Sequence, residues 1–473
     1  MRFPLALTAK IASHIVKHKM RRTPKFAMVL QLEPLHTCNL TCTGCGRIRE
    51  YSTSLKDMMS LEDCLASANE CDAPMVSICG GEPLIYPKIE ELVAGILEQG
   101  RIVYICTNGM FMRKKMREYM ASIYSPMLEM KISKLIEKKL ITEKDAETIR
   151  KGKSGDRPVI SPTKWMYWNV HVDGLEYTHD LIVEREGVFK ECVDAIKMAK
   201  ILGYQVATNT TVYKETQVNE LSEMFEYFSS LEVDGHTISP GYEYDAAKKD
   251  MVKRLGKQPE DFFLTRKMTR EKFAKIQEWG ERFTIFGTVV YQEFLAGKRE
   301  LTCTAWAIPT RNIRGWKAPC YLMTDGHYAG YQEMLSKVNW EKYGVVDGVA
   351  RDPRCENCMV HCGYDPSGAL SPKISDSWKN MKYNFGAKPK PYYAGANVNA
   401  FNGVSIGKGH LAEAKAAINS PRAAMNGAQS VFQRREEPHD HAHAEGSTGS
   451  CGTDTTQRDE LLAKIKKEPT VSP

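Results

Sequence analysis

The sequence predicts an α/β protein whose core is an open or partial barrel of parallel strands. Short β-rich runs alternate with helix-like stretches from residue 27 to residue 241, and such alternation is typical of a parallel sheet. Six strand–helix units can be recognised, a number that suits a partial barrel. The chain has 473 residues, of which 42% are apolar, so it can bury a core of this size.

Each element of the barrel is expected at a definite place in the chain. The strands are expected at residues 27–33, 75–79, 102–107, 167–173, 204–212 and 233–239. The helices between them are expected at 60–71, 88–99, 188–202 and 216–230. Residues 126–156 are highly charged and helix-prone, so they predict a helical hairpin inserted into the barrel, either as a lid or partner surface or as a neutral insertion.

Several of the expected strands are polar on one side. In 102–108, Val103 and Ile105 alternate with polar residues, and 168–173 and 75–79 alternate in the same way. A parallel strand that is covered on both faces should be apolar throughout. A polar inner face therefore predicts a barrel mouth that holds a ligand at the carboxyl ends of the strands. The alternative is ordinary alternation beside helix caps.

The regions outside the barrel differ in character. Residues 1–26 contain a candidate basic amphipathic helix over 3–20, which predicts either docking on an anionic membrane surface or packing on its own domain. Residues 242–385 are first helical and then, over 301–365, rich in Cys, Trp and Pro, which predicts a compact, loop-rich C-terminal extension. Residues 386–473 are rich in Gly, Ala, Ser and Pro and predict a largely disordered tail. The tail also contains a charged helix candidate at 457–467 and the histidines His439, His441 and His443.

The net charge of +7 comes from the N-terminus, since residues 1–32 hold seven Lys and Arg residues and no acid. The rest of the chain is formally neutral, which disfavours a nucleic-acid-binding protein.

No run approaches the roughly 20 consecutive apolar residues of a membrane span, and no secretory signal pattern is recognised. We therefore expect a cytoplasmic protein, with the N-terminal helix as the candidate for peripheral contact with the inner membrane. In a reducing compartment, 14 cysteines indicate metal or redox chemistry rather than disulfides.

Two motifs follow the first two strands. Cys38, Cys42 and Cys45 form a C-x3-C-x2-C motif directly after the first strand. Three thiolates in one loop can bind three irons of a [4Fe–4S] cluster and leave the fourth iron open for another ligand. A zinc site that includes the nearby His36 is the alternative. The second motif, Gly80-Gly-Glu-Pro83, follows the second strand.

In this order and position, the two motifs resemble those of the radical S-adenosylmethionine (radical SAM) superfamily. The resemblance implies a partial (β/α)6 barrel, a [4Fe–4S] cluster with one open iron site, and SAM as a co-substrate that is cleaved to methionine and a 5′-deoxyadenosyl radical. Many members have an aromatic residue before the third cysteine, where this chain has Gly44. By strand order, the residues expected to bind SAM are Gly80, Gly81, Glu82, Pro83, Thr107, Asn108, Asn169, His171, Asp173, Asn209 and Ser239. Alternatively, polar residues at strand ends cap the next helix.

A second cysteine group lies in the C-terminal extension. Its spacing, C-x11-G-x4-C followed by C-x2-C-x3-C, is similar to the opening of the SPASM and twitch extensions of some radical SAM enzymes. The similarity implies a second, auxiliary [4Fe–4S] cluster; a zinc site or inert thiols are the alternatives. The expected ligands are Cys303, Cys320, Cys355 and Cys358, with Cys362 as a substitute.

More specific strings look like the hopanoid-biosynthesis branch of the superfamily, the adenosylhopane synthases. They include Leu32-Glu-Pro-Leu35, His171-Val-Asp-Gly174, Ile238-Ser-Pro-Gly-Tyr242 and Cys358-Met-Val-His-Cys-Gly-Tyr364. This resemblance implies that the 5′-deoxyadenosyl radical adds to the terminal alkene of diploptene, a triterpene lipid, and that ferredoxin or flavodoxin donates electrons.

Radical addition leaves a tertiary carbon radical that needs a hydrogen atom. Cys106 on the polar face of the third strand is the preferred donor, followed by Cys79 and Tyr104. Two other functions stay open at this point. One is a radical SAM enzyme that modifies a peptide or a different lipid. The other is a zinc-thiolate structural protein that docks on membranes and is not an enzyme.

Overall fold

The computed structural model describes residues 2–45, 47–51, 54–152, 157–256, 258–387 and 389. From residue 390 onward, the expected tail lies outside the described residues. The three tail histidines and the helix candidate at 457–467 therefore lie outside them as well.

A nine-stranded sheet forms the core, in the order β6-β5-β4-β3-β2-β1-β7-β8-β9. The first six strands are parallel and correspond to the six predicted runs. They are β1 Val29–Leu32, β2 Met75–Ile78, β3 Ile102–Thr107, β4 Met166–His171, β5 Gln205–Val212 and β6 Gly235–Pro240. Their order in the sheet follows the chain, so the predicted α/β fold with a parallel barrel-like sheet is confirmed.

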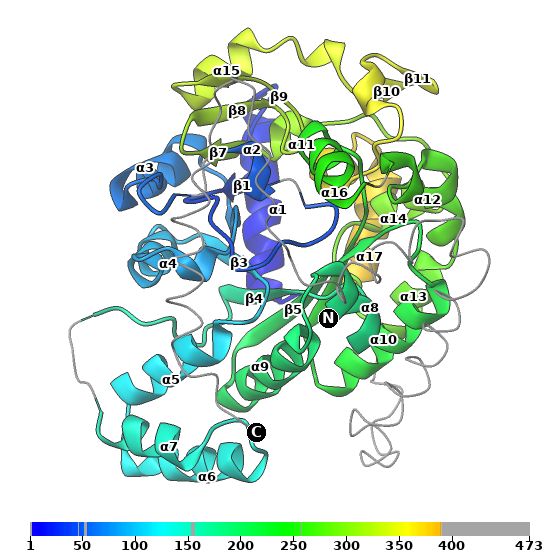
Figure 1. Ribbon diagram of the computed structural model, residues 1–473. Helices are drawn as coiled ribbons and strands as arrows, with labels where there is room; N and C mark the ends of the chain where they lie inside the picture. Colours follow the sequence, from blue (N-terminus) through cyan, green and yellow to red (C-terminus); the bar gives the residue numbers. More distant parts are fainter. Residues whose placement is uncertain are drawn as a thin grey trace, which may run out of the picture.

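Helices connect these strands and cover the outer face of the sheet (Figure 1). Their ends follow from the sequence: α3 begins at Ser60, whose hydroxyl accepts from Asp63 N at 3.0 Å, and α9 ends at Gly203, which has a φ of 94°. The helices of the barrel are α2 Arg47–Glu50, α3 Leu61–Cys71, α4 Ile89–Glu98, α5 Met112–Ser122, α8 Glu176–Ile182, α9 Val188–Leu202 and α10 Val218–Ser230. A 3-10 turn, η1 Pro83–Ile85, follows β2.

The insertion predicted at 126–156 is a helical hairpin. It consists of the 3-10 turn η2 Pro126–Leu128 and the helices α6 Glu129–Glu137 and α7 Glu143–Arg150. A capping box between Thr142 and Asp145 starts α7. Figure 1 shows the hairpin at one end of the molecule, where α6 packs on α9 and α7 packs on α5.

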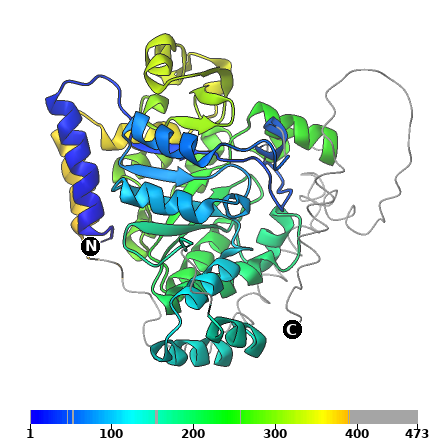
Figure 2. The ribbon, with the colours of Figure 1, turned by 90° about the vertical axis from the view of Figure 1, so that its left-hand side faces the viewer.

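The N-terminal helix α1 (Leu5–Met20) closes the amino end of the barrel. Leu7 is fully buried in a cluster with Tyr104 and Tyr167 from the barrel interior. Figure 2 shows α1 beside α17 (Ile374–Phe385), away from the loop that follows β1. Arg2 N donates to Asn384 O at 2.9 Å, which joins the two helices. The packing of α1 on its own domain is therefore one of its roles.

The C-terminal extension contains strands that the sequence did not predict. We expected residues 301–365 to be loop-rich, but β7 Thr310–Asn312, β8 Gly315–Pro319 and β9 Thr324–Tyr328 extend the main sheet. The expectation of a loop-rich module is thus wrong for this part. The physical reason is that β7 pairs in parallel with the otherwise free edge of β1, and β8 and β9 continue the sheet as antiparallel strands.

The other elements of the extension are mostly short helices, as expected for 242–300. They are α11 Asp245–Asp250, η3 Met251–Leu255, η4 Pro259–Asp261, α12 Arg266–Lys272, α13 Ile276–Arg282, α14 Val289–Leu295, η5 Ala305–Ala307, α15 Tyr331–Lys337, η6 Trp340–Lys342, η7 Pro353–Cys355 and α16 His361–Ala369. The short strands β10 Val345–Val346 and β11 Val349–Ala350 form a separate hairpin. Within the described ranges, no helix has both the length and the apolar character that crossing a membrane requires.

Candidate active site

The C-x3-C-x2-C motif lies in the loop that leaves the carboxyl end of β1. Cys45 N donates to Cys42 O at 3.2 Å, which folds the loop back on itself. Burial is the main cause that raises the pKa of Cys38 to about 12 and the pKa of Cys42 above its usual range, and the nearby Cys45 raises both further. The three thiols therefore lie within electrostatic reach of one another. Metal binding here must displace their protons.

The Gly80–Pro83 motif runs directly beside this loop. Gly81 N donates to Leu35 O at 3.0 Å, and Glu82 N donates to Thr37 O at 2.9 Å. A Cβ atom at Gly81 would overlap the carbonyl oxygen of Thr37. Only glycine permits this close approach of two backbones, so the motif fixes the path of the cysteine loop.

The carboxylate of Glu82 joins the motif to β3. Its Oε1 accepts from Leu84 N at 3.0 Å and from Thr107 Oγ1 at 2.8 Å. Its Oε2 accepts from Asn108 N at 2.8 Å. Burial raises the pKa of Glu82 to about 7, although these three hydrogen bonds oppose the shift. The hydroxyl of Thr107 is therefore engaged with Glu82.

Two asparagines extend the site into the barrel. Asn108 Nδ2 donates to Asn39 Oδ1 at 2.8 Å and lies 3.8 Å from Cys38 Sγ. Asn169 Nδ2 donates to Cys106 Sγ at 3.4 Å. The other amide atom of Asn169, Oδ1, is buried and has no hydrogen-bond partner in the described part of the chain. Such an orphaned acceptor is suited to a ligand that brings a hydroxyl or amine.

The remaining strand-end residues lie along the same edge of the sheet. His171 Nε2 lies 2.9 Å from Asp173 Oδ2. Burial alone would lower the pKa of His171, but the carboxylate of Asp173 outweighs it and raises that pKa. Asn209 is the register partner of His171 on β5. Ser239 Oγ, at the end of β6, lies 3.1 Å from His361 Nδ1 of the extension.

Phe262 fills the space beside Gly44, where many radical SAM proteins have an aromatic residue. A Cβ atom at Gly44 would lie 2.5 Å from the Phe262 ring. That ring stacks on Tyr213 with a centroid distance of 4.2 Å. An aromatic ring from a distant segment therefore lies beside Gly44, and the sequence around Phe262 contains no signal that would have identified it.

The three candidate hydrogen-atom donors lie at different depths. Cys106 Sγ contacts Asn169 Nδ2 at 3.4 Å and a serine hydroxyl of β2 at 3.2 Å. Cys79 is buried at the carboxyl end of β2. Tyr104 lies nearer the amino end of the barrel, where it stacks on Tyr167 at a centroid distance of 4.9 Å and meets α1. Burial raises the pKa of both thiols, so both keep their hydrogen at neutral pH.

The structure brings the cysteines of the extension together from separate segments. They are Cys303, Cys320, Cys355, Cys358 and Cys362. Burial is the main cause that raises the pKa of each thiol, to about 11 for Cys355 and about 12 for Cys358, and neighbouring thiols add to the effect at every one of them except Cys320. A Cβ atom at Gly363 would lie 2.6 Å from Cys303 Sγ, so the start of α16 packs directly on this thiol.

Arg47 connects the two cysteine groups. It lies in α2, two residues after Cys45, and its Nη2 donates to the carbonyl oxygen of Tyr321, the residue after Cys320. Its guanidinium carbon lies 3.7 Å from the centroid of the Tyr321 ring. Burial would raise the pKa of Glu33, but Arg47, together with His36 and Lys317, lowers it to about 2. The sequence gives no signal for Arg47 apart from its position just after the third cysteine.

Both groups have the donor chemistry of an iron–sulfur site. The first offers three thiols in one loop, which fits a [4Fe–4S] cluster with one iron left for SAM. The second offers five thiols, one more than a [4Fe–4S] cluster needs. His36, the alternative zinc ligand, has its Nε2 3.3 Å from Glu33 Oε2, and its Nδ1 is buried without a hydrogen-bond partner in the described part of the chain.

Comparisons with known proteins place two regions of the chain in families. Residues 32–129 match the Radical SAM superfamily, and residues 236–383 match a domain of unknown function, DUF3463. A search of curated proteins finds no match.

Among solved structures, the chain is similar to Streptococcus suis SuiB bound to precursor peptide SuiA, at 12% identity over 74% of each chain, with a TM-score of 0.43. It is also similar to native anSMEcpe with bound AdoMet and Cp18Cys peptide, at 14% identity over 79% of this chain and 98% of that chain, with a TM-score of 0.42. Another SuiB structure aligns at 17% identity over 48% of this chain and 42% of that chain, with a TM-score of 0.30. This last alignment therefore spans less than half of SuiB.

Proposed function

We propose that this protein, a radical SAM enzyme by its match over residues 32–129, adds the 5′-deoxyadenosyl radical to the terminal alkene of diploptene and forms adenosylhopane. The substrate is proposed from the sequence strings that look like those of the adenosylhopane synthases. The structural observation that supports it best is the protonated Cys106 thiol inside the barrel, beside Asn169. When bound through Cys38, Cys42 and Cys45, the [4Fe–4S] cluster supplies the electron that cleaves SAM.

The polar edge of the barrel would hold and orient SAM. Gly80 and Gly81 bring backbone close to the cysteine loop, where the methionine part of SAM would lie. Asn169 Oδ1 is available as an acceptor for a ribose hydroxyl. The pair of His171 and Asp173 adds a second polar position on the same strand. Fixing SAM in one orientation keeps its reactive carbon close to the alkene and away from other groups.

Cys106 would complete the reaction by giving up a hydrogen atom. Addition of the radical to the alkene forms one C–C bond and leaves an unpaired electron on a tertiary carbon. Transfer of the thiol hydrogen to that carbon forms a C–H bond and leaves a thiyl radical. One electron and one proton, with the electron from ferredoxin or flavodoxin, restore the thiol. Ser77 and Asn169 contact the sulfur at 3.2 and 3.4 Å and would hold it in place.

An anaerobic reaction of the cluster-loaded protein with SAM, a low-potential reductant and diploptene tests the proposed substrate. We expect mass spectrometry to detect an adenosine–hopane adduct. Formation of 5′-deoxyadenosine without an adduct would overturn diploptene as the substrate. That outcome would favour the second candidate, a radical SAM enzyme that modifies a peptide or another lipid.

The role of Cys106 needs a separate test, because substrate and hydrogen donor can be wrong independently. Cys106→Ala should still form 5′-deoxyadenosine but lose adenosylhopane. Cys79→Ala removes the other candidate thiol, and Tyr104→Phe removes only a hydroxyl while the ring stack on Tyr167 is kept. Both controls should keep the product. Full product yield from Cys106→Ala would overturn the assignment.

We also propose that the enzyme docks on a membrane, which is where so apolar a substrate resides. The helix α17 exposes four apolar side chains at helical spacing, and α1 beside it has Lys17 and Lys19 in its last turn. The α17 residues are Ile374, Trp378, Met381 and Phe385, which are 87%, 62%, 44% and 50% exposed. This face lies at the amino end of the barrel, opposite the cysteine loop, so it would anchor the enzyme rather than deliver the substrate.

Vesicle binding tests this anchor without requiring activity. Trp378→Ser combined with Phe385→Ser should weaken sedimentation with vesicles that contain anionic phospholipid. Met130→Ser, on the insertion helix α6, is the matched control because Met130 is also apolar and 85% exposed. Equal binding by the double variant and the control would overturn the anchor. It would leave the proposed reaction untouched.

A further inference from the structure

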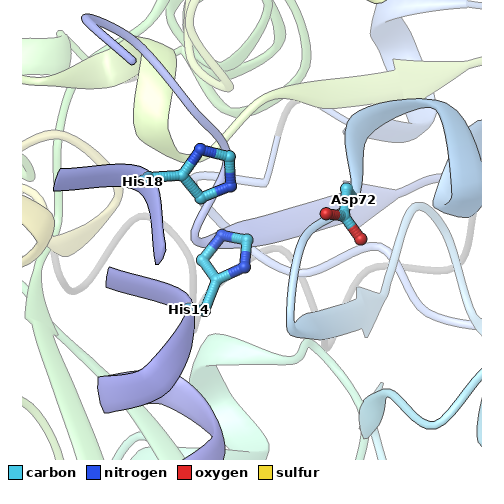
Figure 3. A group of neighbouring side chains, drawn as sticks. All are labelled: His14, His18 and Asp72. Atoms are coloured by element: carbon cyan, nitrogen blue, oxygen red, sulfur yellow. The ribbon is translucent and has the colours of Figure 1, made fainter. Parts of the chain in front are cut away.

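Two histidines and one aspartate meet where the N-terminal helix touches the barrel. His14 and His18 are one turn apart on α1, and Asp72 is the residue at which α3 ends. One ligand atom from each residue lies within 4.8 Å of the other two. Figure 3 shows the two imidazole rings together, with the carboxylate of Asp72 directed toward them. None of these residues belongs to the cysteine sites or to the polar strand ends.

The orientation of His14 is already that of a metal ligand. Its Nε2 lies 2.9 Å from the carbonyl oxygen of Ala27. A carbonyl can only accept a hydrogen bond, so Nε2 is the protonated nitrogen of the neutral ring and Nδ1 keeps its lone pair. Metal-binding histidines usually hold their second nitrogen in this way. The side chain is buried, so this orientation is well fixed.

His18 lacks the partner that its environment calls for. Both of its ring nitrogens are buried, and neither has a hydrogen-bond partner within the described ranges. The ring stacks on Phe26 at a centroid distance of 4.3 Å and lies 4.5 Å from the His14 ring. A buried polar group without a partner costs about 1–3 kcal/mol. A bound cation would satisfy one of these nitrogens.

Asp72 provides an oxygen ligand and access from solvent. Lys17 Nζ contacts its Oδ2 at 3.0 Å, and Arg101 Nη1 lies 3.5 Å from its Oδ1. These two cations orient the carboxylate, as groups around a metal-binding carboxylate commonly do. The Asp72 side chain is 52% exposed, so an ion can enter from solution.

We propose that His14, His18 and Asp72 bind one Zn²⁺ ion, with water as the fourth ligand. Two imidazoles and one carboxylate are a common Zn²⁺ ligand set, whereas Ca²⁺ and Mg²⁺ prefer sites built from oxygen atoms. The ion would fasten α1 to the end of α3 and so hold the helix that closes the amino end of the barrel. This site does not depend on the reaction proposed above.

The experiment measures zinc in the cluster-loaded protein, so that the cysteines are already occupied. Wild type, His18→Ala, Asp72→Asn and the control Lys19→Ala are incubated with Zn²⁺, gel-filtered and analysed for zinc and iron. We expect one zinc per chain in wild type and in Lys19→Ala, none in the other two, and equal iron in all four. Asp72→Asn changes a half-exposed residue, so it keeps the test decisive if His18→Ala fails to fold. Equal zinc in all four proteins would overturn the site.

Co²⁺ in place of Zn²⁺ identifies the ligands directly. A site made of two imidazoles and one carboxylate gives visible d–d bands without thiolate-to-metal charge transfer. We expect this spectrum in wild type and its loss in Asp72→Asn. Thiolate charge transfer would show that the ion binds at cysteines, and it would overturn the proposal.

Discussion

The two cysteine groups offer the same ligand atom but are assembled in different ways. Cys38, Cys42 and Cys45 lie in one loop, and the backbone of the Gly80–Pro83 motif contacts residues 33–37, which lead into that loop. The second group is collected from four places between Cys303 and α16. The thiols of the first group are therefore close in sequence, whereas those of the second group meet only after the extension has packed.

The charges around the two groups also differ. Glu82 raises the pKa of Cys38, and Asp173 and Glu184 raise the pKa of Cys42. Around the second group the charges are mixed: Lys317 and Arg47 act to lower the pKa of Cys320 and Arg266 acts to lower that of Cys358, whereas Asp352 raises that of Cys355. Anionic surroundings suit a co-substrate with a sulfonium and an ammonium group, such as SAM. Cations beside two of the thiols suit a cluster held entirely by thiolates.

The largest expected effect is the loss of the first group. Cys42→Ala should reduce 5′-deoxyadenosine formation to background, because SAM cleavage requires the cluster that this loop would hold. Iron content should fall by about four atoms per chain. The iron of the second group should stay, since it uses none of these thiols. Loss of all iron would contradict the independence of the two sites.

The loss of the second group should have a smaller effect on SAM cleavage. Cys320→Ala should also remove about four irons per chain. The rate of 5′-deoxyadenosine formation should change by less than about tenfold, which corresponds to about 1.4 kcal/mol. Cys362→Ala is the matched control and should keep its iron, because Cys362 is the expected spare thiol. The reverse pattern, with iron kept by the first variant and lost by the second, would exchange their roles.

The contrast between features built from neighbouring residues and features built from distant segments also explains which parts of the structure the sequence predicted. The six parallel strands, the hairpin insertion and the first cysteine loop depend on local patterns, and the structure contains them where they were expected. The strands β7 to β9 were missed because β7 is three residues long and forms only by pairing with β1, far away in the chain. The contact of Phe262 with Gly44 and that of Arg47 with Tyr321 are missed for the same reason.

Glu82, beside the first cysteine group, makes the stability of the folded protein depend on pH because its pKa is raised. Its pKa in the folded protein is about 7, above the ordinary 4.5, so the folded state binds this proton more tightly than the unfolded chain does. The resulting stabilisation is complete below pH 4.5 and is lost as the pH rises through 7, by roughly 3 kcal/mol at 1.36 kcal/mol per pKa unit. The melting temperature should therefore fall less between pH 5 and pH 8 in Glu82→Gln than in wild type. Glutamine cannot accept all three hydrogen bonds, so Glu82→Gln should have a lower melting temperature than wild type at any pH. The test therefore compares only how steeply the melting temperature falls with pH in the two proteins. An equal fall in melting temperature in both proteins would contradict the raised pKa of Glu82.

A pair of glycines gives the smallest and most direct comparison of the two groups. In Gly81→Ala the new methyl group would overlap the backbone of Thr37, which cannot rotate away. We therefore expect the free energy of unfolding to fall by about 1–3 kcal/mol. We also expect the first site to lose iron. In Gly363→Ala the methyl group would meet the Cys303 side chain, which can rotate. Alanine also favours the helix α16 by about 1 kcal/mol over glycine. The free energy of unfolding of Gly363→Ala should therefore change little, whereas the iron content of the second site should fall. Gly326→Ala is the control, since a Cβ atom there meets nothing within 4 Å. Equal iron in Gly363→Ala and this control would show that the second group adapts where the first cannot.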